Sequence, residues 1–225
     1  MKAEQIIRHG IANTCRFISD ENYREMTYVT FEGIAQTGIV DHFFSTRMGG
    51  VSTGDTATLN FSYSRGDKKE NVDENFRRAA AHFGKDAKEI VCSQQTHTTN
   101  VRKVTSADKG KGVTKAQDYT DVDGLITNES GIILATFFAD CVPLFIVDPI
   151  SYSIGLSHSG WRGTVDKMGK VTLDCMAREY GARAENVRVA IAPSICQSCY
   201  EVSEDVALAF EAAFPKNEDM AREYL

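Results

Sequence analysis

Two short segments near the middle of the chain carry residue types that bind metals. Ala139-Asp140-Cys141 follows one apolar run, and His158-Ser159-Gly160-Trp161-Arg162-Gly163 follows the next. Each segment places a metal ligand at the end of a predicted buried strand. With His97 upstream the set is His, Cys and His, which zinc prefers in sites that keep one coordination position open. The residues therefore predict a catalytic metal site and not a structural one.

Each of these residues has an ordinary structural interpretation when taken singly. Cys141 alone is typical of a small buried side chain, and His97 of a loop histidine. Asp140 is a poor choice for the end of a purely apolar strand, because a charge there needs a partner. It is expected to act as a general acid or base, or to orient His158, and we favour the orienting role.

Two arginines beside glycines are candidate anion-binding residues. Arg162 lies where a strand gives way to a helix, so its guanidinium and free backbone amides would both favour a phosphate or carboxylate. Arg47 is followed by Gly49 and Gly50, whose amides can approach an anion closely. Trp161, the single tryptophan, is equally well explained as a core residue and as a substrate contact.

The rest of the pattern predicts an α+β fold, with a mixed β-sheet flanked by helices in a single domain. Closely spaced strands favour antiparallel pairing. Gly84 and Gly181 are expected to end helices, and Ser203 to cap the last one, in which Val206, Phe210, Ala213 and Phe214 form the core stripe. The predicted strands cover residues 28–31, 39–44, 122–127, 132–138, 144–147, 152–157 and a buried 187–192; the predicted helices cover 71–83, 164–180 and 204–214.

Composition excludes several classes of protein. The 225 residues are 42% hydrophobic, with a net charge of -6 and a pI near 5.4. An acidic chain without a basic stripe is not expected to bind nucleic acid. No stretch approaches the roughly 20 apolar residues of a membrane span, and no signal peptide opens the chain, so we expect no membrane contact and a cytoplasmic location. The oligomeric state stays open.

The six cysteines are widely scattered and are expected to be reduced thiols. Cys196 and Cys199 have the spacing of half a zinc knuckle or of a redox pair. A second such pair and a thioredoxin-like context are both absent, which favours a structural or supporting role. The surrounding residues also lack the H-x-E motif of nucleobase deaminases, which excludes that architecture.

A series of ordered motifs resembles a known bacterial family. The chain is similar to the laccase-domain family, also called multicopper polyphenol oxidoreductases or peptidoglycan editing factors. The motifs that carry the resemblance are Phe44-Ser45-Thr46-Arg47-Met48-Gly49-Gly50-Val51-Ser52, Leu59-Asn60-Phe61, Gln95-Thr96-His97, Asp121-Val122-Asp123-Gly124, Ala139-Asp140-Cys141-Val142-Pro143, His158-Ser159-Gly160-Trp161-Arg162-Gly163 and Cys199-Tyr200-Glu201-Val202.

The resemblance implies a single domain of the laccase type, similar to the cytotoxic necrotizing factor fold, over residues 1–225, without the family's usual C-terminal segment. It also implies one metal site on His97, Cys141 and His158, with zinc expected and copper possible. Asn60 would then either position the substrate or stabilise a turn.

The function implied is zinc-dependent phosphorolysis of adenosine, inosine or methylthioadenosine, with adenosine deaminase as a side activity. The partners would be a purine nucleoside and phosphate. Editing of peptidoglycan precursors, polyphenol oxidation and a non-catalytic metal-binding role are the alternatives. Five histidines are too few to hold several coppers, which disfavours a true multicopper oxidase.

Overall fold

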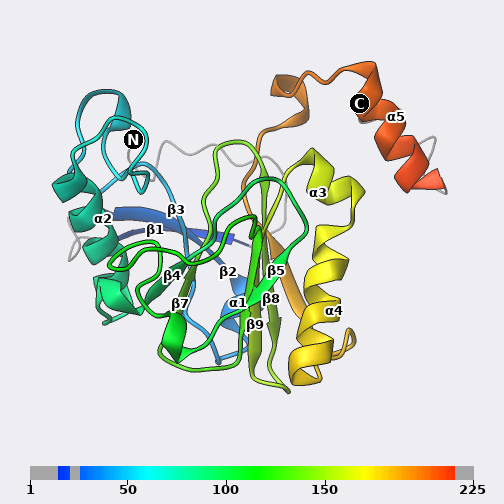
Figure 1. Ribbon diagram of the computed structural model, residues 1–225, viewed down its shortest axis with the longest axis horizontal. Coiled ribbons are helices and arrows are strands. Elements are labelled where there is room, and N and C mark those ends of the chain that lie inside the picture. The colour runs from blue at the N-terminus through cyan, green and yellow to red at the C-terminus, as the bar shows by residue number, and fades with distance from the viewer. Residues whose placement is uncertain (1–14, 21–25, 216–225) are drawn as a thin grey trace. The chain divides into compact units, whose positions relative to one another are not determined.

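The computed structural model describes residues 15–20 and 26–215 (Figure 1). Its architecture is α+β, as the sequence predicts. The chain separates into two compact units, which are described one at a time. The first contains the described residues up to Cys92, Thr105–Asp118 and Glu129–Ile133; the second contains Ser93–Val104, Tyr119–Asn128 and the chain from Leu134 onward.

The first unit is built on a three-stranded antiparallel sheet in the order β1-β2-β3. Met26, Tyr28 and Leu59 form a buried cluster on it. Helix α2 ends where predicted, because Gly84 adopts a left-handed φ of 64°. The elements are β1 (Cys15–Asp20), β2 (Met26–Phe31), α1 (Glu32–Ala35), β3 (Phe44–Ser45), α2 (Lys69–His82), β4 (Ile90–Cys92) and the 3-10 turns η3 (Gly54–Thr56), η4 (Ala87–Glu89) and η5 (Ser106–Asp108).

The strand predicted over residues 39–44 is wrong for most of its length, since only β3 forms there. His42 provides the physical reason. Its Nε2 accepts the backbone N–H of Phe31 at 2.8 Å, and its ring stacks on the Phe31 ring. The His42 side chain thus satisfies the Phe31 N–H at the end of β2. A longer β3 would have bonded this N–H through its backbone.

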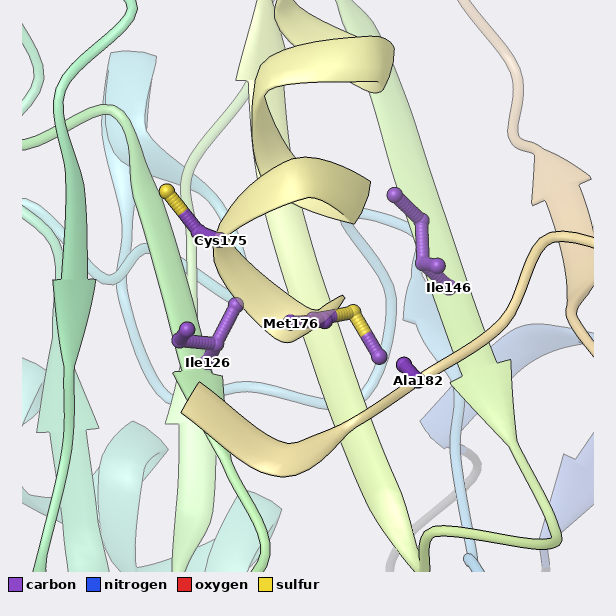
Figure 2. Close-up of a cluster of buried hydrophobic side chains, with 5 residues drawn as sticks. All are labelled: Ile126, Ile146, Cys175, Met176 and Ala182. Atoms are coloured by element: carbon purple, nitrogen blue, oxygen red, sulfur yellow. The ribbon is translucent and has the colours of Figure 1, made fainter. Parts of the chain in front are cut away.

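The second unit is built on a five-stranded sheet in the order β10-β8-β9-β6-β5. Four strands pair antiparallel, as predicted, and β5 runs parallel to β6. Helix α4 packs on this sheet. Its Cys175 and Met176 form a buried cluster with Ile126 and Ile146 of the strands (Figure 2). The elements are β5 (Val101–Lys103), β6 (Gly124–Thr127), β8 (Val142–Asp148), β9 (Ser153–Ser159), α3 (Trp161–Val165), α4 (Met168–Tyr180), β10 (Arg188–Ile191), the 3-10 turn η6 (Gln197–Cys199) and α5 (Glu204–Ala213); β7 spans Ile133–Ala135.

The helix predicted over residues 164–180 consists of two helices. Lys167 lies between α3 and α4 with a left-handed φ of 60°, so the helical backbone is interrupted there. Gly181, at φ 73°, ends α4 as predicted. The strand predicted over 132–138 shortens to β7. None of the described helices is long and apolar enough to cross a membrane.

The last two elements are less buried than predicted. β10 forms, but at the edge of the sheet, where Val189 and Ile191 are 57% and 69% exposed. In α5 only Val206 of the predicted core stripe is buried. Ser203 occupies the N-cap position of α5, as predicted, but its hydroxyl bonds to the Asp205 side chain and accepts no backbone N–H of the helix.

Candidate metal centre

The side chains of His97, Cys141 and His158 converge within the second unit. One ligand atom from each residue lies within 4.8 Å of the other two. The Cys141 sulfur is 3.8 Å from Nε2 of His97, and the two imidazole rings lie 5.0 Å apart, centroid to centroid, at 77°. His158 is buried, Cys141 is half-buried and His97 is exposed. The cluster therefore opens to solvent on the His97 side.

The pairing of β8 with β9 brings two of the three ligands together. Pro143 lies opposite His158 in this ladder, and Val142 lies opposite Ser159. Cys141 immediately precedes β8, so the register fixes it beside the end of β9. Antiparallel pairing buries the backbone polar groups of both strands in hydrogen bonds, which makes this a rigid support.

His97 comes from a loop that is held by its neighbours. Its φ of 67° lies in the left-handed region, which is uncommon for a residue other than glycine. The Gln95 side chain fixes the loop by bonding both backbone groups of Phe137, with its Nε2 at 2.6 Å from the carbonyl and its Oε1 at 2.7 Å from the nitrogen. Strain of this kind persists only where surrounding contacts determine it.

Asp123 joins the two histidines through one carboxylate. Its Oδ1 accepts from Nδ1 of His158 at 2.7 Å and from the backbone N–H of His97 at 3.1 Å. Its Oδ2 accepts the N–H groups of Thr96 and Thr98 at 3.0 and 3.1 Å. Because an ionised carboxylate only accepts, the proton of His158 lies on Nδ1 and its Nε2 is left as a lone-pair donor.

Sequence reasoning missed this role of Asp123. The prediction that Asp140 orients His158 is wrong, because Asp123 occupies that position while Asp140 is exposed. The sequence did contain a signal for Asp123, because this residue immediately precedes β6, whose four residues are all buried. A fully buried carboxylate at the start of such a strand requires several donors. A catalytic role for Asp140 stays a prediction.

Gly160 leaves the space in which the ligands gather. A Cβ atom at this position would lie 2.9 Å from Cδ2 of His97 and 3.1 Å from the Cys141 sulfur. Only glycine can therefore stand here without displacing two of the three ligands.

Burial and charge set the protonation of the ligands. Burial lowers the pKa of His158, although Asp123 opposes this shift. For Asp123 burial would raise the pKa, but the N–H donors of Thr96 and Thr98 and the His158 ring outweigh it and leave the pKa lowered. Burial, followed by the negative charges of Asp140 and Asp123, raises the pKa of the Cys141 thiol. An incoming cation must therefore displace the Cys141 proton.

Trp161 and Arg162 follow the cluster as the first residues of α3. The Arg162 guanidinium lies over the indole of Trp161, 4.2 Å from the ring centroid. Trp161 is half-buried and Arg162 is exposed. The helix that Arg162 was expected to adjoin has only five residues. Its backbone amides therefore contribute less to anion binding than predicted. Anion binding by Arg162 and substrate contact by Trp161 stay predictions.

The other predicted binding residues lie in the first unit and contact the backbone. Arg47 donates to the carbonyls of Asp55 and Ala57 at 2.9 to 3.1 Å. Gly50 donates its N–H to the Thr58 hydroxyl, and a Cβ atom at Gly50 would lie 1.9 Å from the Thr58 carbonyl oxygen.

Gly49 and Asn60 have comparable local roles. Gly49, at φ 91°, has its carbonyl bonded by buried Arg78 at 2.8 Å. The Asn60 amide bonds the backbone of Ser62 and the carboxylate of Asp67, which matches the turn-stabilising interpretation. Anion and substrate binding by Arg47, Gly49, Gly50 and Asn60 stay predictions.

Comparison with known proteins gives a consistent result. A family model described as "Multi-copper polyphenol oxidoreductase laccase" matches residues 41–224. "Purine nucleoside phosphorylase YlmD" of Bacillus subtilis (strain 168) is 37% identical over 182 residues, which are 79% of this chain and 64% of that protein. The chain thus spans less than two thirds of this curated relative.

Two further similarities bear on fold and chemistry. The crystal structure of the Bacillus licheniformis hypothetical protein YfiH superposes with a TM-score of 0.77 at 27% identity, covering 93% of this chain and 75% of that one. "Adenosine deaminase RL5", from an unknown prokaryotic organism, is 35% identical over 135 residues, which are 60% of this chain and 51% of that protein.

Proposed function

The chain belongs to the multi-copper polyphenol oxidoreductase laccase family, and from this premise we propose that it is a zinc-dependent purine nucleoside phosphorylase. The observation that carries the proposal is the convergence of His97, Cys141 and His158 within 4.8 Å. The phosphorylase named among its relatives supports the reaction, and the substrates would be a purine nucleoside and phosphate.

The donor set fits zinc. Two imidazole nitrogens and one thiolate are borderline to soft ligands that suit a tetrahedral site with one open position. Asp123 already supplies the carboxylate that zinc-binding histidines use to fix their tautomer. Copper(I) is the alternative metal, since thiolate also suits it. Zinc would supply Lewis acidity, which polarises a substrate oxygen or lowers the pKa of a water molecule.

The protein's own groups prepare this chemistry. Asp123 holds both the His97 backbone and the His158 ring, so the loop that carries His97 and the ring of His158 are fixed before a metal binds. Burial keeps His158 neutral, which preserves its lone pair on Nε2. Asp140 is exposed next to Cys141, where it would exchange a proton with a substrate.

We assign substrate recognition to Trp161 and Arg162, which follow the cluster in the chain, and to Arg47. Trp161 offers an aromatic surface for a purine base, and Arg162 a guanidinium for phosphate. Arg47 is the other phosphate candidate; the residue is exposed, and its guanidinium also donates to the carbonyls of Asp55 and Ala57.

The test is a nucleoside panel assayed with and without phosphate. Purified zinc-loaded protein should release a free base and a pentose 1-phosphate from inosine or adenosine only when phosphate is present. His158→Ala should abolish this turnover. Base release that does not depend on phosphate, or turnover retained in His158→Ala, would contradict the proposal.

Adenosine deamination is the second candidate, favoured by the similarity to a protein named adenosine deaminase. A zinc site that activates water suits hydrolytic removal of an amino group. The two functions separate in the same assay, because deamination converts adenosine to inosine with release of ammonia and needs no phosphate.

A further inference from the structure

Cys196 and Cys199 lie at the two ends of a single tight turn. The turn η6 covers Gln197–Cys199, with Cys196 as the residue before it, in the orange segment that leads into α5 (Figure 1). Both cysteines are exposed free thiols. The metal cluster does not use them, although they belong to the same unit.

The turn holds the two thiols together. The Cys199 N–H donates to the Cys196 carbonyl at 3.0 Å, which closes the turn. In a 3-10 turn, side chains three residues apart are eclipsed, and a rise of about 2.0 Å per residue separates their Cα atoms by roughly 6 Å. This separation lies within the range that a disulfide spans.

We propose that Cys196 and Cys199 form a redox-active dithiol that is oxidised to an intramolecular disulfide by small-molecule disulfides. The Cys196 thiolate attacks one sulfur of the disulfide, forming a mixed disulfide and releasing one thiolate. Cys199, after losing its proton to solvent, attacks the Cys196 sulfur and releases the second thiolate. The protein loses two hydrogen atoms, and the small disulfide gains two electrons and becomes two thiols.

The surroundings of Cys196 identify it as the attacking thiol. The Ser198 hydroxyl lies 3.2 Å from its sulfur. This hydroxyl, followed by the Cys199 thiol and backbone N–H, lowers the pKa of Cys196. In contrast, burial raises the pKa of Cys92 to about 12, and Cys175 is buried in the core. Thiolate character and exposure together select Cys196 for exchange.

The position of the turn dictates how the experiment is done. The N–H of Ile195 donates to the Asp140 carbonyl at 3.0 Å, so the turn is joined to the loop that leads into Cys141. The protein should therefore be loaded with zinc before oxidation, and the modified cysteines identified by peptide mapping. Cys141 and Cys196 are then distinguished directly.

The test is titration of the zinc-loaded chain with oxidised glutathione at neutral pH. Wild type should lose two hydrogen atoms in the peptide that carries both cysteines. Cys199→Ser should stop at a mixed disulfide on Cys196, and Cys196→Ser should react at Cys199 at least about tenfold more slowly. Cys175→Ser, which changes a core thiol, is the control and should behave like wild type.

Two results would overturn the proposal. One is a wild-type chain in which Cys196 and Cys199 do not form a disulfide with each other, either because both stay thiols or because the glutathione mixed disulfide on Cys196 persists beside a free Cys199 thiol. The other is equal reactivity of the single thiols in Cys199→Ser and Cys196→Ser, which would show that the turn does not activate Cys196. Either variant that fails to fold is replaced by the corresponding alanine variant, with circular dichroism as the check.

Discussion

Oδ1 of Asp123 lies 2.7 Å from Nδ1 of His158, and the same oxygen accepts the backbone N–H of His97 at 3.1 Å. One buried atom therefore fixes both the ring of one ligand and the loop of another. Carboxylates in this position raise the basicity of a ligating imidazole and limit its rotation. The quality of the site depends on a residue that would not itself contact a metal.

The first prediction concerns Asp123→Asn. An amide keeps one acceptor oxygen and turns N–H groups toward the backbone donors of residues 96 to 98, so the ligands lose their alignment. We expect zinc affinity to fall by about 10- to 100-fold. Competition with a chromophoric chelator measures this directly. Asp140→Asn is the matched control, because Asp140 is exposed and it is Asp123, not Asp140, that accepts from Nδ1 of His158; equal losses in the two variants would contradict the assignment.

The second prediction compares two glycines that are three residues apart. Gly160→Ala places a methyl group 2.9 Å from the His97 ring and 3.1 Å from the Cys141 sulfur. Overpacking of this size costs about 1–3 kcal/mol, which would weaken zinc binding by about 5- to 150-fold. At Gly163 the nearest atom would be 3.5 Å away, so Gly163→Ala should bind zinc normally. Equal zinc binding in the two variants would show that the cluster does not need the space that Gly160 leaves beside His97 and Cys141.

The third prediction concerns metal content. Purified protein should carry about one zinc per chain, and Cys141→Ala and His158→Ala should each lose it, because either change removes one of the three donors. Elemental analysis of dialysed protein gives the stoichiometry. Full zinc in both variants would exclude this cluster as the metal site. Several equivalents of copper in wild type would support the oxidase alternative.

Residue type and strand position predicted that His97, Cys141 and His158 come together, and the structure brings them within 4.8 Å of one another. Cys141 and His158 each adjoin a strand end, and antiparallel pairing of neighbouring strands makes such ends meet. Asp123 was missed because its role depends on a contact between residues 35 positions apart. No local pattern states which of several carboxylates will reach a given imidazole.

The errors in the predicted elements also arise from features that a local sequence pattern does not encode. The strand expected over 39–44 failed because the His42 side chain replaced a backbone partner of β2. The helix expected over 164–180 kept its apolar periodicity across Lys167, whose left-handed backbone no propensity indicated. β10 was predicted from composition as a buried strand, but composition does not say whether a strand lies at the centre or the edge of its sheet.

The fourth prediction separates two roles of Arg47. Its guanidinium donates three hydrogen bonds to the carbonyls of Asp55 and Ala57, which neither alanine nor lysine can reproduce. Both Arg47→Ala and Arg47→Lys should therefore lower the free energy of unfolding by about 1–2 kcal/mol. If Arg47 also binds phosphate, the lysine variant should retain a lower KM for phosphate than the alanine variant. Identical phosphate kinetics in wild type and both variants would leave Arg47 with the loop role alone.

The last prediction concerns Asp148, a fully buried carboxylate at the end of β8. It accepts backbone N–H groups from Ile150 at 2.8 Å, Ser151 at 3.4 Å and Arg183 at 3.1 Å. Burial would raise its pKa, but these donors outweigh burial and leave the pKa below its ordinary value. A carboxyl group whose pKa is lower in the folded state stabilises the fold at neutral pH. That contribution disappears as the pH falls below the unfolded value of about 3.9 and through the folded value.

Asp148→Asn should therefore destabilise the second unit by about 1–3 kcal/mol at pH 7, since the amide leaves backbone donors without an acceptor. The difference between wild type and variant should narrow as the pH is lowered toward 3, because only wild type loses a charge at this position. Urea unfolding followed by the fluorescence of Trp161, the single tryptophan and a residue of the same unit, measures both curves. A difference that stays constant or widens in acid would show that ionisation of Asp148 does not stabilise the fold.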